Sequence, residues 1–133
     1  NRHWCHHHHR HAEPHPSVEG LAGDYLDWAN KFVFVVPEYN GGYPGMLKAF
    51  IDAVPPSKFH FKKAALIGLS SGHLGCVRGM DSLTNVLNYL KVSVLFNKPK
   101  LSAIESILDV NKNIVKPHII EGLERHQEQL IEF

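Results

Sequence analysis

Two glycine-rich loops hold the residues of this sequence whose types and spacing are best suited to chemistry. The first, "PEYNGGYPG", starts at residue 37 and offers a carboxylate at Glu38, an aromatic ring at Tyr39 and an amide at Asn40. The second, "SSGHLG", starts at residue 70 and offers two hydroxyls, an imidazole at His73 and backbone N–H groups that glycine leaves uncovered. Together these groups suit a flat, hydrogen-bonding and partly anionic ligand. The alternative is that both are ordinary turns that use glycine for its backbone conformations.

Each loop follows an apolar run that predicts a strand. The run "FVFVV", residues 32–36, is continuous, β-branched and aromatic, which predicts a strand buried on both faces of a parallel sheet. The run "AALIGL", residues 64–69, predicts a second such strand. Helical spacing follows both loops, after Pro44 and over residues 77–90. The repeated order of strand, glycine-rich loop and helix indicates two similar units.

The remaining elements complete an alternating pattern. We predict a first helix from Ser17 to near Asn30, a third strand at residues 93–96, an irregular connection after it, and a last helix from Pro117. This alternation predicts an α/β protein with a parallel sheet. Because ligands of such sheets bind beyond the carboxyl ends of the strands, we expect the two loops to face one site.

Composition excludes several other classes of protein. The 133 residues suffice for one domain, and the formal net charge of +1 gives no basic surface of the kind that binds a nucleic acid. The sequence contains neither an apolar run long enough for a membrane span nor a secretory signal. The two cysteines are too few for a disulfide scaffold, so we expect a cytoplasmic protein without nucleic-acid or membrane partners.

The N-terminal stretch "NRHWCHHHHRHAEPHP" differs from the rest of the chain. Its clustered histidines and Cys5 could hold a transition metal. The interpretation that we favour is a tag or disordered leader, because the stretch has no helical or strand period. We therefore expect a leader at residues 1–16, a domain at residues 17–133 and no metal site.

The stretch "VVPEYNGGYPGMLKAFID" resembles the signature of the NADPH-dependent FMN reductases, which are flavodoxin-like enzymes that reduce quinones, chromate or azo dyes. The similarity continues through "KKAALIGLSSGHLGCVRGMDSLTNVLNYLKVSVLFNKP", with the second loop at the expected separation. It covers the chain from about Asp24 to the C-terminus. The resemblance implies a flavodoxin-like three-layer sandwich that binds FMN and takes a hydride from NADPH or NADH.

The same resemblance assigns residues to the flavin site. The flavin carries the chemistry in such enzymes, so we expect no catalytic acid or base and give Glu38 a binding or structural role. The electron acceptor would be a small molecule, and the protein a homodimer or homotetramer. Tyr43 and Arg78 are weaker candidates for contact with substrate or nicotinamide. The residues expected to bind FMN are Pro37, Glu38, Tyr39, Asn40, Ser71, Gly72, His73 and Gly75.

The sequence departs from the family pattern at its N-terminus. Family members begin with a strand and a serine-rich loop that holds the FMN phosphate, and the strand would neighbour residues 32–36. Neither segment is recognisable here, so we expect a chain that is truncated or incomplete at its N-terminus. The alternative is a flavin-poor binding or regulatory protein that keeps the fold and has lost the phosphate loop.

Overall fold

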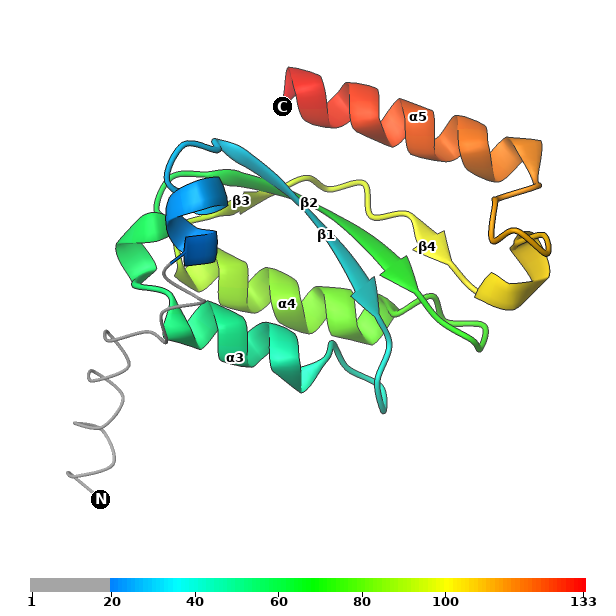
Figure 1. The fold of residues 1–133 in the computed structure, drawn as a ribbon, viewed down its shortest axis with the longest axis horizontal. Helices are drawn as coiled ribbons and strands as arrows, with labels where there is room; N and C mark the ends of the chain where they lie inside the picture. Colours follow the sequence, from blue (N-terminus) through cyan, green and yellow to red (C-terminus); the bar gives the residue numbers. More distant parts are fainter. Residues whose placement is uncertain (1–19) are drawn as a thin grey trace.

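The computed structural model describes residues 20–133, and it arranges them in three layers (Figure 1). Two helices lie on one face of a parallel sheet and a third lies on the opposite side. This confirms the predicted α/β sandwich; the expected leader at residues 1–16 lies outside the described residues. The elements are η2 (Ala22–Leu26), β1 (Lys31–Pro37), α3 (Gly45–Ala53), η3 (Pro56–Lys58), β2 (Lys63–Leu69), α4 (Val77–Tyr89), β3 (Ser93–Val94), β4 (Lys100–Leu101), η4 (Ile104–Ile107) and α5 (Pro117–Glu132).

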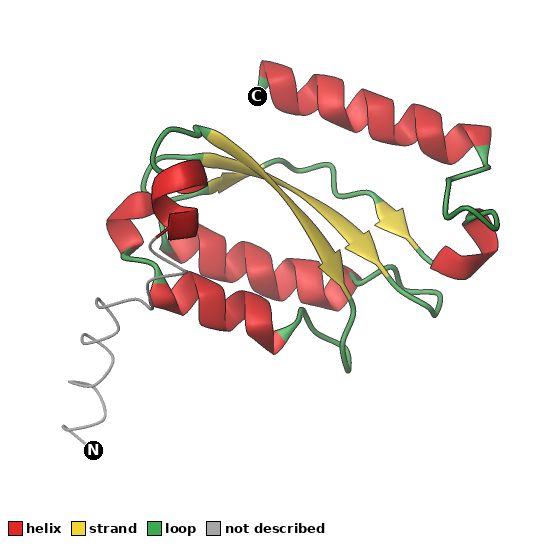
Figure 2. Cartoon of the chain, viewed as in Figure 1, coloured by secondary structure: helices red, strands yellow, loops and turns green. Residues whose placement is uncertain are grey.

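Strand β2 is the centre of the described sheet (Figure 2). It pairs in parallel with β1 over its whole length, from Lys31 opposite Lys63 to Pro37 opposite Leu69. Its other edge pairs with two short strands, β3 near its start and β4 near its end. The predicted strand at residues 93–96 is thus limited to two residues, and part of the irregular connection supplies β4.

The hydrophobic core lies between the sheet and helices α3 and α4. Phe32, Phe34 and Val36 alternate along β1 toward this side, as the two-residue period of a strand requires. Helix α4 adds three side chains that are almost fully buried at helical spacing, Met80, Leu83 and Leu87. In the described chain, no helix is long and apolar enough to cross a membrane.

Helix α5 is held over the opposite face of the sheet by polar contacts near its C-terminus. Lys31 Nζ donates hydrogen bonds to the carbonyl oxygens of Leu130 and Ile131, at 2.9 and 2.7 Å. Lys63 Nζ donates to the carbonyl oxygen of Phe133. These lysines begin β1 and β2, and their charges complement the negative end of the helix.

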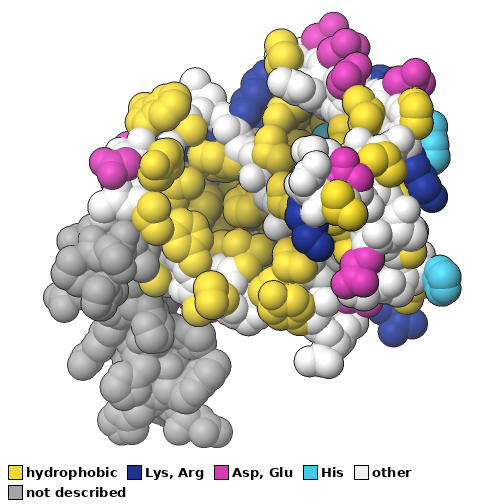
Figure 3. Space-filling model, turned by 45° about the vertical axis from the view of Figure 1, so that its right-hand side comes forward, with side chains coloured by type: hydrophobic (Ala, Val, Ile, Leu, Met, Phe, Trp, Pro, Cys, Tyr) yellow, Lys and Arg dark blue, Asp and Glu magenta, His cyan; other side chains and the backbone are white. Residues whose placement is uncertain are grey.

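The prediction that residues 32–36 are buried on both faces is wrong. Val33 is 52% exposed and Val35 is 55% exposed, because no described element covers these two residues on the α5 side. The outer edge of β1 also pairs with no strand among residues 20–133. Figure 3 shows hydrophobic side chains gathered in a hollow on the side of the molecule where β1 lies in Figure 1. The apolar run therefore forms an edge strand with one covered face.

Candidate functional site

The two glycine-rich loops leave the sheet side by side. Pro37 ends β1 directly opposite Leu69, which ends β2. The first residue beyond β1, Glu38, continues the pairing because its N–H donates to the Leu69 carbonyl oxygen at 2.9 Å. Both loops therefore begin at one point on the carboxyl edge of the sheet, as the strand order predicts.

A tight turn forms the tip of the first loop. Tyr39 and Gly42 exchange backbone hydrogen bonds of 2.9 and 3.1 Å, and the two residues between them, Asn40 and Gly41, have φ values of +53° and +78°. Positive φ at both central positions is the type I′ geometry of a two-residue hairpin, for which Asn-Gly is the preferred pair. The Asn-Gly dipeptide is thus the sequence signal for this turn, and the interpretation of the loop as a site overlooked it.

Ser70 organises the second loop, although the sequence analysis gave it no separate role. Its side chain is buried; Oγ accepts a hydrogen bond from the Gly75 N–H at 2.8 Å and donates one to the Gly72 carbonyl oxygen at 2.9 Å. The segment after β4 supports the same loop, since the Ala103 N–H donates to the Gly72 carbonyl oxygen at 2.7 Å. The sequence feature that could have indicated this role is a serine at the carboxyl end of a strand, five residues before a glycine.

Glycine at position 79 brings the start of α4 into contact with the first loop. A Cβ atom there would lie 2.5 Å from Cys76 Sγ and 2.8 Å from both the Gly42 carbonyl carbon and the Tyr43 nitrogen. Cys76 Sγ itself lies 3.9 Å from the Gly42 carbonyl oxygen. Because only glycine permits this approach, the start of α4 packs directly on the first loop. Gly79 was missed because it stands inside a regular helical pattern.

The space beneath the loops contains a buried thiol and a partly buried carboxylate. Burial and then the nearby Glu38 carboxylate raise the pKa of the Cys76 thiol, against smaller opposing hydrogen bonds from the backbone of Gly79 and Met80. Cys76 is therefore a neutral packed residue and no reactive thiolate. Glu38 Oε1 is buried without a hydrogen-bond donor among the described residues. Such an oxygen favours a donor from a bound molecule.

The predicted flavin-site residues fall into two groups. Ser71, Gly72 and His73 are exposed at the tip of the second loop, and their N–H groups donate no hydrogen bond within residues 20–133. Tyr39 is 60% exposed and lies in the opposing loop. Gly75, in contrast, is buried at φ +60°, and a Cβ there would lie 2.5 Å from Lys100 Cβ. Packing against Lys100 therefore explains why glycine is required at position 75.

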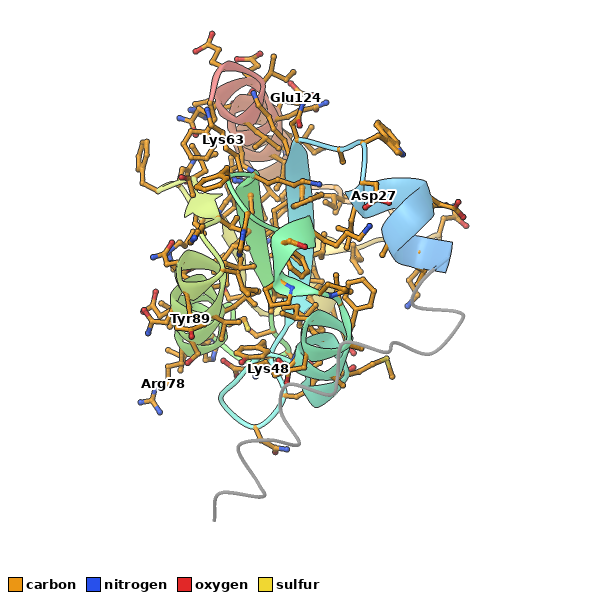
Figure 4. All side chains as sticks on the ribbon, turned by 90° about the vertical axis from the view of Figure 1, so that its left-hand side faces the viewer. Asp27, Lys48, Lys63, Arg78, Tyr89 and Glu124 are labelled. Atoms are coloured by element: carbon orange, nitrogen blue, oxygen red, sulfur yellow. The ribbon has the colours of Figure 1, made fainter. Side chains whose placement is uncertain are left out.

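The weaker candidates lie on α4 and around the first loop. Tyr43 is half-buried and packs against the core. Arg78 is exposed and extends outward from α4 (Figure 4). On α3, Lys48 Nζ lies 3.0 Å from the Asp52 carboxylate, and both side chains are more than 40% exposed. This is a solvated ion pair between residues four apart on one helix.

Together the loops form a wall of backbone donors with an aromatic ring and a carboxylate beside it. Uncommitted N–H groups at the second loop can bind electronegative atoms of a ligand, and the exposed Tyr39 ring can lie against a planar group. No described side chain pair supplies a general acid next to a nucleophile. The arrangement can bind and orient a planar, hydrogen-bonding molecule.

Comparison with solved structures identifies the class of protein as flavodoxin-like. The flavoenzyme FerB, an NAD(P)H:(acceptor) oxidoreductase from Paracoccus denitrificans, superposes with a TM-score of 0.75 at 22% identity, over 90% of this chain and 68% of FerB. A structure of an NADH:FMN oxidoreductase superposes with a TM-score of 0.63 at 18% identity, over 86% of this chain and 60% of that one. These likenesses establish the fold and confirm the predicted fold class.

Sequence comparison identifies the family. The model of the NADPH-dependent FMN reductases matches residues 2–103. A 2-hydroxy-1,4-benzoquinone reductase from a Burkholderia species is 39% identical over 106 residues, which are 75% of this chain and 57% of that protein. An NAD(P)H-dependent FMN reductase from Pseudomonas aeruginosa is 32% identical over 120 residues, 86% of this chain and 64% of that protein. The chain belongs to the NADPH-dependent FMN reductase family and spans less than two thirds of these relatives.

Proposed function

We propose that this protein is an NAD(P)H-dependent FMN reductase that passes electrons to a quinone or a similar small acceptor. The observation that carries the proposal is that the two loops leave the carboxyl edge of the sheet side by side, in a chain of this family. The two curated relatives described above are named for FMN reduction and for benzoquinone reduction. Chromate and azo compounds are further acceptors within the same proposal.

The described residues fit a flavin by their donors and by one orphaned acceptor. The free N–H groups of Ser71, Gly72 and His73 suit the polar edge of a flavin ring, and Glu38 Oε1 lacks a donor that a ring N–H would supply. Bound FMN would accept a hydride from the nicotinamide and release the electrons to the acceptor. The protein would hold and orient both partners.

Assembly and location belong to the same proposal. We infer a homodimer or homotetramer in the cytoplasm, with Arg78 and Tyr43 near the nicotinamide or the acceptor. Arg78 supports this assignment because it is an exposed, unpaired guanidinium among the described residues, close in sequence to the second loop. Guanidinium groups bind phosphate through two parallel hydrogen bonds.

The direct test is a titration of the 133-residue protein with FMN, followed by an assay of NADPH oxidation with 1,4-benzoquinone. We expect quenching of FMN fluorescence at micromolar concentrations and quinone-dependent loss of NADPH absorbance. The matched variant is Gly72→Val, which adds a side chain at an exposed position with no atom within 4 Å and should weaken FMN binding at least tenfold. Gly20→Val is the control, because Gly20 is equally open and precedes η2, far from both loops.

The outcome also decides between the reductase and its rival. A protein that binds no FMN at tens of micromolar, while its circular dichroism shows a folded α/β domain, contradicts the reductase proposal. That result would support the alternative, a flavin-poor binding protein of the same fold.

A further inference from the structure

A second concave site lies between β4 and α5, and its β4 segment adjoins the second loop through the packing of Lys100 against Gly75. A cavity of about 430 Å³ separates the segment around β4 from the first half of α5, which run alongside each other in Figure 1. None of the residues predicted to bind FMN lines it. Its volume lies within the range of small-molecule sites in proteins.

One lysine, one arginine and one histidine line the cavity, and no carboxylate lines it. Lys100 comes from β4, His118 from the first turn of α5 and Arg125 from the third. Among residues 20–133, none of the three forms a salt bridge. Lys100 and Arg125 carry positive charges that no carboxylate of the cavity balances, so an anion bound between them would be stabilised. The apolar side chains of Leu101 and Ile119 also line the cavity.

Gly122 keeps the cavity open. It stands in the middle of the 16-residue helix α5, where glycine is the least favourable residue after proline. Its backbone has no left-handed φ, and a Cβ there would meet no atom within 4 Å, so neither conformation nor packing requires glycine. Since Gly122 lines the cavity, a larger side chain at this position would fill it.

We propose that this cavity binds a small organic anion with an apolar body, of the class of aromatic carboxylates. The carboxylate would lie among Lys100, His118 and Arg125, and the apolar body would contact Leu101 and Ile119 in the space that Gly122 leaves free. None of the lining residues belongs to the two loops, so binding at this site does not require bound flavin. The protein would thus bind a second ligand on the α5 side of the sheet.

The test uses 2-naphthoate as the anionic probe and 2-naphthamide as its neutral match. In ¹H–¹⁵N NMR titrations of the full chain without FMN, we expect 2-naphthoate to shift the resonances of residues 97–101 and 118–125 with a submillimolar Kd. The amide should bind at least tenfold more weakly. Gly122→Leu should lower the affinity for 2-naphthoate at least tenfold by filling the cavity, and the double variant Lys100→Met/Arg125→Met should do so by removing charge.

The controls exclude simpler explanations. Gln127→Leu adds the same side chain at an exposed position of α5 outside the cavity and should leave the affinity unchanged. Equal affinities for the acid and the amide, shifts confined to other residues, or unchanged binding by folded Gly122→Leu would each overturn the proposal. Because FMN takes no part, these results stand whatever the flavin titration shows.

Discussion

At the scale of single residues, the candidate site depends on glycines as much as on residues with functional side chains, because glycine lets neighbouring segments approach closely. Gly79 lets the first turn of α4 approach the first loop, and Gly68 does the same for the second loop, where a Cβ would collide with the Gly75 carbonyl oxygen and with Met80. Both glycines lie inside regular elements, where glycine normally weakens the structure. The loss of stability that these glycines cause is offset by the close packing that they allow around the two loops.

Opposite stability effects are expected from the same substitution at two helical glycines. Gly79→Ala places a methyl group 2.5 Å from Cys76 Sγ and against the backbone of the first loop, so it should destabilise the fold by about 1–3 kcal/mol. Gly122→Ala meets no atom within 4 Å and should stabilise the fold by about 0.5–1 kcal/mol through helix propensity. Urea unfolding of both variants measures the difference. Stabilisation by both substitutions would contradict the proposed packing of α4 on the loop.

At the scale of the elements, α5 carries a buried histidine that makes stability depend on pH. His126 is only 3% exposed, and its Nε2 atom has no hydrogen-bond partner among the described residues. Burial lowers the pKa of His126 from its ordinary value of 6.5, against a smaller opposing hydrogen bond to the Asn97 backbone. The folded state therefore prefers the neutral imidazole.

The sign of the pH effect follows from this preference. Below about pH 6.5 the unfolded chain binds a proton at His126 that the folded chain does not, so the free energy of unfolding should fall as the pH is lowered. The limiting slope for one such group is about 1.4 kcal/mol per pH unit. Urea unfolding between pH 7.5 and 5.5 measures the dependence, and His126→Gln should flatten it.

His118→Gln is the matched control on the same helix. This variant removes an exposed histidine and leaves His126 in place, so the pH dependence that His126 causes should remain. If His126→Gln retains the full dependence, another group is responsible and burial of His126 does not control the pH response.

The sequence predicted the strands and helices well where local apolar runs and spacing determine them. The apolar runs became β1 and β2, and the spacing of Met80, Leu83 and Leu87 gave the buried side of α4. The position of both loops followed from strand order, because parallel strands end at one edge. The packing of the loops did not, because contacts such as Ser70 Oγ with Gly75 and Gly79 with Gly42 are set by tertiary geometry. The prediction that residues 32–36 are buried on both faces was wrong because apolar side chains show only that a strand can be buried. They do not show which other elements pack against it.

At the scale of the whole molecule, residues 20–133 leave one side of β1 uncovered, unlike a strand inside an α/β sandwich. Val33 and Val35 are more than half exposed, and the outer edge of β1 is unpaired among residues 20–133. An open edge of seven residues beside an apolar surface is a template for pairing with another chain. We therefore expect the 133-residue protein to self-associate through β1 at micromolar concentrations.

Replacing both valines by threonine tests this expectation, because threonine keeps the shape and strand propensity of valine and adds a hydroxyl. Burial of a valine contributes about 1.5–3 kcal/mol, so the double variant Val33→Thr/Val35→Thr should weaken association by about tenfold or more. Sedimentation velocity over a concentration series measures the change, with Val110→Thr as the control because Val110 is 94% exposed and lies outside the sheet. Association that is unchanged by the double variant would place the contact on another surface, and a wild-type protein that stays monomeric would show that this face is covered in solution.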